Sequence, residues 1–552
     1  MPIRSAKIGL TLVNFIVLFC AFSIGTDSSA LVETYDARIS GNEILTPAAP
    51  ESPRINGPAL YGCTPNKPLV YRMPTQGVRP MTFSAKGLPH SIKLDRKNGI
   101  LSGKTPDKKG DYKIILIARN NYGEDSFEWT LVVGDKIALT PPMGWNHWYT
   151  HYHFITDRDI RAAADAMVAS GMADVGYSYV SIDDCWMRIT EEWAKKSMER
   201  KRRTASVGLD VERVVGQVRD KNGRILPNAN FPDMVSLTEH IHQKGLKAGI
   251  YTSPGPRTCQ EFEGSWQHEA IDAATYAEWG FDLLKYDWCR YGEIFNQLPE
   301  AKRSLDEYKK PYQVMWSILQ EQNRDILQNL CQYGMAEVWK WGHEVGHSWR
   351  TGGDLGHTLT EGGVYKIAKK NIELRQHNGP CSWNDPDYLI LGKWRSPFDK
   401  AAPISPVELT PNEQYSYVSL WCLMACPLFF SGDMSQMDDF TVNLLCNPEM
   451  IAVNQDRLGL CAEPVRMDES TWILKKEMSD GSVVVGFFDV AGEGDRQIRV
   501  TWDELDICFG QSTRDLWRQK ELGVSEEDFT VAVGPLGCAV IRFTRFYAGG
   551  LS

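Results

Sequence analysis

Short apolar runs alternate with amphipathic stretches through the middle of the chain, and this pattern predicts repeated strand–helix units. Segments such as "KAGIYTS" (247–253) have the apolar run of a buried strand. Stretches such as "DRDIRAAADAMVASG" (157–171) have the spacing of a helix. Strands that alternate with helices in this way form parallel sheets. The expected strands are 143–148, 178–184, 247–253, 282–288, 326–332, 349–354, 381–389 and 428–434.

These strands lie within residues 137–457, which is long enough for a (β/α)8 TIM barrel with insertions. An open, doubly wound sheet is the alternative. A nucleotide-binding sheet of that kind carries a glycine-rich phosphate loop after its first strand. No such loop follows "MGWNHW" (143–148), so the barrel is favoured.

Two flanking segments alternate apolar with polar residues, as antiparallel strands do. Residues 55–135 contain "DYKIILIARN" and "FEWTLVV", with turn signals such as Asn98-Gly99. Residues 460–552 contain "TWILKKEMSDGSVVVGFFD" (471–489). We therefore expect an all-β region before the barrel and a second antiparallel β domain after it. Residues 26–54 are polar and rich in Pro, Ala and Ser, and are expected to form a linker.

The N-terminus has the layout of a secretory signal peptide. Arg4 and Lys7 precede an apolar run at 8–22, and small residues follow it. We expect residues 1–25 to be this signal and the mature protein to be secreted or periplasmic. Cys20 would permit a lipid anchor, but the bulky Phe19 before it disfavours one. No other segment is apolar for long enough to insert stably in a membrane.

Composition narrows the class of protein further. The 552 residues carry a net charge of −10, and the densest basic patch, 195–203, is expected to be a solvated insertion. Nucleic-acid binding is therefore disfavoured. The 18 Trp and 21 Tyr suit a ligand with flat apolar faces, such as a sugar. Most of the 13 Cys lie in apolar runs, but Cys259 and Cys289 both follow predicted strands, and we expect a disulfide between them.

The residues at the predicted strand ends are mainly acidic and aromatic, and barrel enzymes place their active sites at these ends. The chain shows no His pair at metal spacing there, and Lys285 and Arg350 are poor neighbours for a cation. We therefore expect neither a metal nor a cofactor. Carboxylates, cations and aromatic walls together suit a polyhydroxyl ligand. The candidate residues are Trp148, Asp183, Asp184, Tyr251, Lys285, Asp287, Gln332, Arg350, Asp354 and Asp387.

Eight motifs follow one another along the chain: "TPPMGWNHW" (140–148), "YVSIDDCW" (179–186), "GIY…TC" (249–259), "DLLKYDWC" (282–289), "WRTGGDL" (349–355), "WNDPDYL" (383–389), "ACPLFFSGDM" (425–434) and "AVNQDRLG" (452–459). In this order they resemble glycoside hydrolase family 27, the α-galactosidase family. The family resemblance covers roughly 138–546 and implies an exo-acting hydrolase of terminal α-galactosides, from oligosaccharides or polysaccharides. The stretch 87–133 also resembles the Ig-like repeats of secreted bacterial proteins, which implies a spacer or accessory β-sandwich.

The resemblance implies a retaining mechanism with two carboxylates. Asp287 matches the nucleophile and Asp354 the general acid/base, so their carboxyl groups should lie about 5–5.5 Å apart. Lys285 should lower the pKa of Asp287. The remaining matches concern substrate and framework: Asp183 and Asp184 for the sugar's 4- and 6-hydroxyls, Trp148 and Tyr251 for the walls, Arg350 and Gln332 near the 2-hydroxyl, Asp387 as a further pocket residue, and Cys259–Cys289 as a bridge between active-site loops.

The chain also departs from the family pattern. "TSPGPRTC" (252–259) stands where many members have Ala-Asp-x-Gly, and Gln332 stands where some have Glu. Three other family activities remain as alternatives: α-N-acetylgalactosaminidase, β-L-arabinopyranosidase and isomaltose-releasing dextranase. A carbohydrate-binding protein without catalysis is the alternative from a different class. The sequence does not indicate the oligomeric state, the natural substrate, or the roles of the N-terminal module and the 187–230 insertion.

Overall fold

The computed structural model describes residues 34–200, 210–356, 358–360, 363–396 and 402–546. The expected signal peptide (1–25) and the first part of the expected linker lie outside these residues. Among the described helices, none combines the length and the apolar character needed to cross a bilayer.

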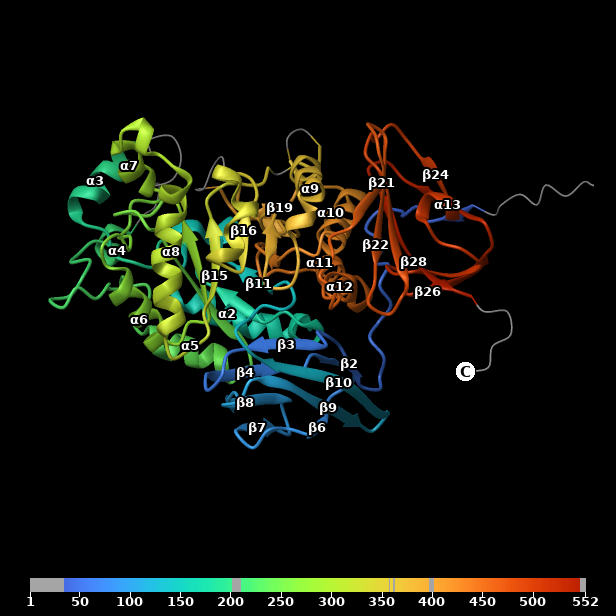
Figure 1. The fold of residues 1–552 in the computed structure, drawn as a ribbon, viewed down its shortest axis with the longest axis horizontal. Helices are drawn as coiled ribbons and strands as arrows, with labels where there is room; N and C mark the ends of the chain where they lie inside the picture. The colour runs from blue at the N-terminus through green and yellow to red at the C-terminus, as the bar shows by residue number, and fades with distance from the viewer. Residues whose placement is uncertain (1–33, 201–209, 357, 361–362, 397–401, 547–552) are drawn as a thin grey trace, which may run out of the picture. The chain divides into compact units, whose positions relative to one another are not determined.

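Eight parallel strands form the central sheet, and all eight coincide with strands expected from the sequence (Figure 1). Neighbours along the sheet are in the order β17-β16-β15-β14-β13-β12-β11-β20. A parallel bridge between Leu389, which follows β17, and Phe430 of β20 joins the two edges and closes the barrel. The strands are β11 (Met143–Asn146), β12 (Tyr179–Ser181), β13 (Lys247–Thr252), β14 (Leu283–Asp287), β15 (Leu327–Cys331), β16 (Ser348–Arg350), β17 (Trp383–Asp385) and β20 (Leu428–Phe430).

The barrel strands are buried on both faces, because side chains fill the inside and helices cover the outside. Every residue of β11, β12, β14, β16, β17 and β20 is buried, as expected for strands of a parallel sheet. After β15 the chain forms only the short 3₁₀ turns η4 (Met335–Lys340) and η5 (Gly342–Glu344). The longer helices are α2 (Asp157–Ala169), α3 (Glu191–Arg200), α5 (Met234–Gln243), α6 (Glu269–Trp279), α8 (Leu305–Glu321), α9 (Val364–Glu373) and α10 (Pro411–Leu423).

Local signals fix where several of these helices begin. Thr156 and Asp159 form a capping box at the start of α2, and Thr410 and Glu413 form another at the start of α10. Each box satisfies backbone N–H groups that a helix end leaves without partners. The helices therefore start at defined residues, and this fixes the lengths of the loops that precede them.

A second set of antiparallel strands follows the barrel, as expected. Its six-stranded sheet has the order β21-β22-β23-β28-β25-β26, and a three-stranded sheet has the order β1-β27-β24. The strands are β21 (Glu463–Met467), β22 (Thr471–Glu477), β23 (Val483–Asp489), β24 (Arg496–Thr501), β25 (Gln511–Asp515), β26 (Lys520–Ser525), β27 (Asp528–Val533) and β28 (Cys538–Arg545). Buried side chains from both sheets, such as Phe487 and Val531, share one core, so this region is a β-sandwich.

The segment expected as a linker makes specific contacts where the structure describes it. Strand β1 (Tyr35–Asp36) pairs with β27 in parallel and so extends the three-stranded sheet. Leu45 is buried, and its backbone N–H bonds to the hydroxyl of Tyr415 in α10. A few apolar side chains in a polar stretch are enough to attach it, and overall composition did not reveal them.

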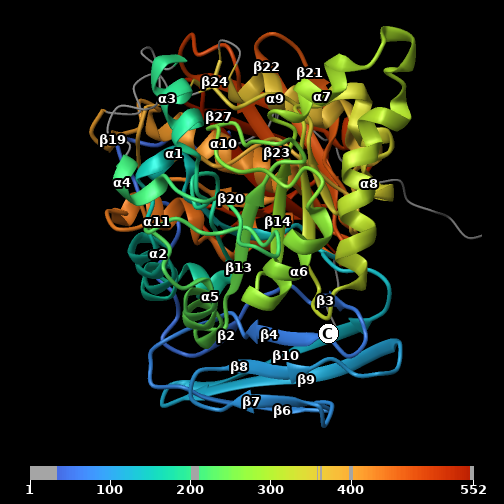
Figure 2. The same ribbon diagram turned by 90° about the vertical axis from the view of Figure 1, so that its left-hand side faces the viewer.

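The N-terminal β region packs two sheets around Trp129, whose ring stacks on Tyr71 with centroids 4.6 Å apart. The sheet orders are β3-β10-β9-β6 and β4-β8-β7, and Figure 2 shows the long strands β9 and β10 side by side. Thr64 of this region donates its backbone N–H to Asp325, just before β15. The region thus contacts the end of the barrel opposite the strand C-termini. The strands are β3 (Leu60–Cys63), β4 (Pro68–Arg72), β6 (Thr82–Lys86), β7 (Ile92–Asp95), β8 (Ile100–Lys104), β9 (Gly110–Asn120) and β10 (Gly123–Val133).

Candidate active site

A pocket of about 120 Å³ lies at the C-terminal ends of the barrel strands. Eight of the ten predicted site residues line it, together with Cys259 of the predicted disulfide and four residues that the sequence did not single out. The lining residues are Trp148, Tyr149, Asp183, Tyr251, Cys259, Gln260, Lys285, Asp287, Tyr333, Arg350, Asp354, Asp387 and Tyr388.

Another hollow of similar size, about 100 Å³, lies between the N-terminal β region and the barrel, but its chemistry is different. Several of its charged groups are already paired. Asp325 accepts hydrogen bonds from Thr64, and the ammonium of Lys247 bonds to the hydroxyl of Tyr61. These contacts hold two parts of the fold together. The pocket at the strand C-termini is therefore the better candidate, because it gathers several carboxylates around open space.

Asp287 ends β14 with its carboxylate in this pocket, and it is only 6% exposed. The hydroxyl of Tyr333 donates a hydrogen bond to its Oδ1 over 2.6 Å. Burial raises the pKa of Asp287, and Lys285 and Tyr333 only partly oppose this effect. Lys285 lowers this pKa, as expected, but the cost of burying the charge outweighs the nearby cation, so the net shift is upward.

Lys285 precedes Asp287 by two residues in β14, so both side chains point to the same face. Its Nζ lies 2.8 Å from Oδ2 of Asp183, and both residues are buried. Asn146 and Tyr388 donate to the same oxygen, over 2.9 and 3.2 Å. Burial alone would raise the pKa of Asp183, but Lys285 and the other partners hold it below its usual value. The wall of the pocket therefore holds a fixed anion beside a fixed cation.

Asp354 follows β16 and lies at the mouth of the pocket, with 69% of its side chain exposed. Arg350 is buried, and its Nη2 lies 3.4 Å from Asp354 Oδ1 and 2.9 Å from Asp387 Oδ2. Burial raises the pKa of Asp387 to about 6, although Arg350 opposes this. Asp387 also has a φ of 97°, a backbone conformation that is strained for a residue with a side chain. Two carboxylates in unlike surroundings thus share one guanidinium.

Aromatic rings cover the remaining walls. Trp148 is half-buried, while Tyr251 is buried and lies below the ammonium of Lys285, 5.4 Å from its ring centroid. The sequence did not single out Tyr149, Gln260, Tyr333 and Tyr388. Each of them directly follows a residue that it did single out. Their position next to a predicted residue on an active-site loop could therefore have identified them, but only residues at the strand ends were selected.

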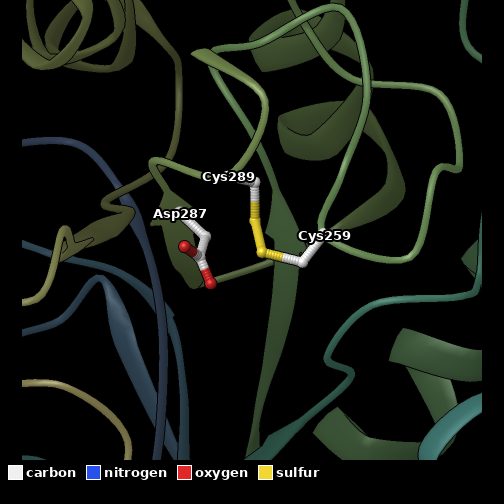
Figure 3. Close-up of side chains that lie close together, drawn as sticks. All are labelled: Cys259, Asp287 and Cys289. Atoms are coloured by element: carbon white, nitrogen blue, oxygen red, sulfur yellow. A yellow bond between two sulfur atoms is a disulfide. The ribbon is translucent and has the colours of Figure 1, made fainter. Parts of the chain in front are cut away.

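The disulfide between Cys259 and Cys289 is present in the structure, as predicted, and it links the loops that follow β13 and β14. Figure 3 shows the carboxylate of Asp287 beside this bridge. Ligand atoms of these three residues lie within 4.8 Å of one another. The two sulfurs are joined to each other, so they offer no thiolate to a metal ion. The bridge instead ties the loop that follows Asp287 to the loop that follows β13.

Asp184 and Gln332 are the two predicted contacts that do not line the pocket. Asp184 is buried and accepts the backbone N–H of Gln260 over 2.9 Å, and burial raises its pKa to about 7. The side-chain amide of Gln332 bonds to both backbone groups of Met335. Both side chains thus hold loops whose other residues reach the pocket.

Comparison with protein families identifies two matching regions. A family described as alpha galactosidase A matches residues 140–207 and 203–456. A family described as the alpha galactosidase C-terminal beta sandwich domain matches residues 468–543. Among curated proteins, "Alpha-galactosidase A" of Cellvibrio japonicus is 33% identical over 433 residues, which is 74% of this chain and 93% of that protein. "Alpha-galactosidase 2" of Arabidopsis thaliana is 31% identical over 76% of this chain and 93% of its own length.

Solved structures agree with these matches. A Bacteroides fragilis protein of the α-galactosidase/melibiase type superposes with a TM-score of 0.79 at 31% identity, over 91% of this chain and 99% of its own. Alpha-galactosidase I from Mortierella vinacea superposes with a TM-score of 0.62 at 27% identity, over 74% of this chain and 98% of its own. The Bacteroides match must extend into the N-terminal β region, because it covers so much of the chain.

Proposed function

Because this chain belongs to the alpha galactosidase A family, glycoside hydrolase family 27, we propose that its pocket cleaves terminal α-galactosides, with Asp287 and Asp354 as the catalytic pair. The protein is a glycoside hydrolase of the α-galactosidase type. One observation supports the residue roles most strongly. Asp287 and Asp354, which come from different barrel strands, line one pocket together with Lys285, Asp183 and Arg350.

In the first step, a carboxylate oxygen of Asp287 attacks the anomeric carbon of galactose. Asp354 gives its proton to the departing oxygen, the bond to that oxygen breaks, and a galactosyl ester of Asp287 forms. The two positions suit these roles. Asp287 is enclosed beside the buried ammonium of Lys285, whereas Asp354 is exposed at the mouth, where a leaving group exits.

In the second step, water enters at the mouth and Asp354 takes its proton. The water oxygen bonds to the anomeric carbon, and the electron pair of the ester bond returns to Asp287. Two displacements at one carbon restore the original α configuration. Such a mechanism requires the two carboxyl groups to lie about 5–5.5 Å apart.

A carboxylate deeper in the pocket favours a hexose over arabinose. Asp183 offers a carboxylate to hydroxyls at the far end of the sugar, which suits a sugar that has a 6-hydroxyl, unlike arabinose. The comparisons bear on the other activities, because the curated proteins that match most of this chain are named α-galactosidases. α-Galactosidase is therefore the best-supported member of the family's activities.

The test is a panel of p-nitrophenyl glycosides of α-galactose, α-N-acetylgalactosamine, β-L-arabinopyranose and α-glucose. We expect the highest kcat/KM for α-galactose. Asp287→Asn should abolish turnover on it. Asp354→Asn should keep more activity on this activated substrate than on an unactivated α-galactoside, because only a poor leaving group needs the acid. Near-normal turnover of the unactivated substrate by both variants would show that the residue roles are wrong.

A further inference from the structure

Tyr333 lies directly against the carboxylate that is proposed to attack the sugar. Its hydroxyl donates to Asp287 Oδ1 over 2.6 Å. Among the described residues, no other side chain donates a hydrogen bond to Asp287, and Oδ2 receives none. Since Tyr333 also lines the pocket, its hydrogen bond distinguishes the two oxygens of the nucleophile.

The backbone around Tyr333 holds this hydroxyl in a fixed direction. Tyr333 and Gly334 have φ values of 63° and 80°, in the left-handed region that a tyrosine adopts only when its surroundings enforce it. The side chain of Gln332 spans the turn. It accepts the N–H of Met335 over 2.6 Å and donates to the carbonyl of Met335 over 3.1 Å. The strained turn is therefore closed by a side chain that has both of its polar atoms engaged.

On the other side, Gly334 lies too close to the neighbouring chain to be replaced freely. A Cβ added there would lie 2.2 Å from the carbonyl oxygen of Thr351, which directly follows β16. The turn is thus wedged against the strand that precedes Asp354. This close contact restricts the turn, and with it the position of the Tyr333 hydroxyl.

We propose that Tyr333 is a positioning residue that holds Oδ1 of Asp287, so that Oδ2 forms the bond to the anomeric carbon and the carboxylate departs readily in the second step. This role rests on the proposed function. Tyr333 keeps its proton throughout, since the leaving oxygen is protonated by Asp354 and the ester's electron pair returns to Asp287. Gln332 acts through Tyr333 by closing the turn.

Loss of the hydroxyl should have a defined chemical effect. A donor on a carboxylate oxygen favours the ionised form, so its removal raises the pKa of Asp287. The nucleophile is then protonated at a higher pH. It is also a poorer leaving group, so the galactosyl ester hydrolyses more slowly.

The experiment compares the pH dependence of wild type, Tyr333→Phe and Tyr312→Phe with p-nitrophenyl α-galactoside. In Tyr333→Phe, we expect the acid limb of kcat/KM to move up by about one pH unit and kcat to fall about tenfold. KM should fall as well, because the galactosyl enzyme accumulates. Tyr312 is the matched control, since it is buried and its hydroxyl has no hydrogen-bond partner among the described residues. Tyr312→Phe should keep the wild-type acid limb.

Two results would overturn the inference. One is an acid limb and kcat in Tyr333→Phe that match wild type. The other is a fall in activity with an unmoved acid limb, which would indicate a structural role alone. Asp287→Asn separates this inference from the proposed function. If that variant is inactive while Tyr333→Phe behaves as wild type, only the role of Tyr333 fails. If Asp287→Asn keeps turning over substrate, the proposed function fails.

Discussion

The disulfide between Cys259 and Cys289 should stabilise the protein by an amount that follows from the loop it closes. The two residues are 30 apart in sequence. In the chain-entropy treatment, closing a loop of this length in the unfolded chain corresponds to about 3.6 kcal/mol at 25 °C. Replacing both cysteines by serine should lower the free energy of unfolding by roughly that amount. Activity should also fall, because Cys289 follows Asp287 by two residues and its Sγ lies 3.1 Å from the Tyr251 hydroxyl.

Urea unfolding followed by tryptophan fluorescence measures the stability change, and kcat/KM on an aryl α-galactoside measures the functional one. We expect Cys259→Ser/Cys289→Ser to lose at least about tenfold in kcat/KM, since small displacements of a nucleophile are costly. Cys508→Ser is the control, because Cys508 is exposed and free. Wild type treated with dithiothreitol should behave like the double variant. A stability loss below about 1 kcal/mol, or one that equals the loss in Cys508→Ser, would refute the entropic reasoning.

Three further substitutions test the electrostatics and the turn. Lys285→Met leaves the buried Asp183 unpaired, so the free energy of unfolding at pH 7 should fall by about 3–5 kcal/mol. Without Lys285, burial raises the pKa of Asp183, so the variant binds a proton there at acidic pH and no longer buries an unpaired charge. Urea unfolding at pH 4 should therefore show a smaller difference. Burial raises the pKa of Asp184 to about 7, so the protonated side chain stabilises the fold fully at pH 4 and this stabilisation is lost by pH 7. The free energy of unfolding of Asp184→Asn, relative to wild type, should therefore rise between pH 4 and pH 7, by roughly 4 kcal/mol at most. Gly334→Ala places a Cβ 2.2 Å from the carbonyl oxygen of Thr351 and should lower kcat/KM by more than about tenfold, because it displaces a group in the active site. Gly171→Ala is the control: its φ of 87° is similar but a Cβ there meets open space, so it should keep wild-type kinetics. Each argument is contradicted by one result. For the turn it is unchanged activity in Gly334→Ala, and for the ion pair it is equal destabilisation by Lys285→Met at both pH values. For Asp184 it is an effect of Asp184→Asn that does not depend on pH.

The sequence predicted the barrel well, for a physical reason. Strands buried on both faces have short apolar runs, and their C-terminal ends meet at one edge of the sheet. Charged residues just after such runs, such as Lys285, Asp287 and Arg350, therefore stood out before any coordinates were considered. The structure places all three in one pocket.

Loop conformation and burial set the limit of that prediction. Tyr333 reaches Asp287 through a left-handed backbone, and neither its φ of 63° nor its hydrogen bond is visible in the letters of the sequence. Asp183 and Asp184 are consecutive, and consecutive side chains near a strand end tend to point to opposite sides. Only Asp183 reaches the pocket wall. The raised pKa of Asp287 required knowledge of its burial, whereas Lys285 alone suggested the opposite direction.

Covalent trapping tests the central claim most directly. A 5-fluorogalactosyl fluoride should form a galactosyl ester that hydrolyses slowly, and peptide mass mapping then locates the labelled residue. The account predicts one fluorogalactosyl group on Asp287, and no label on Asp287→Asn. A label on any other carboxylate would contradict it.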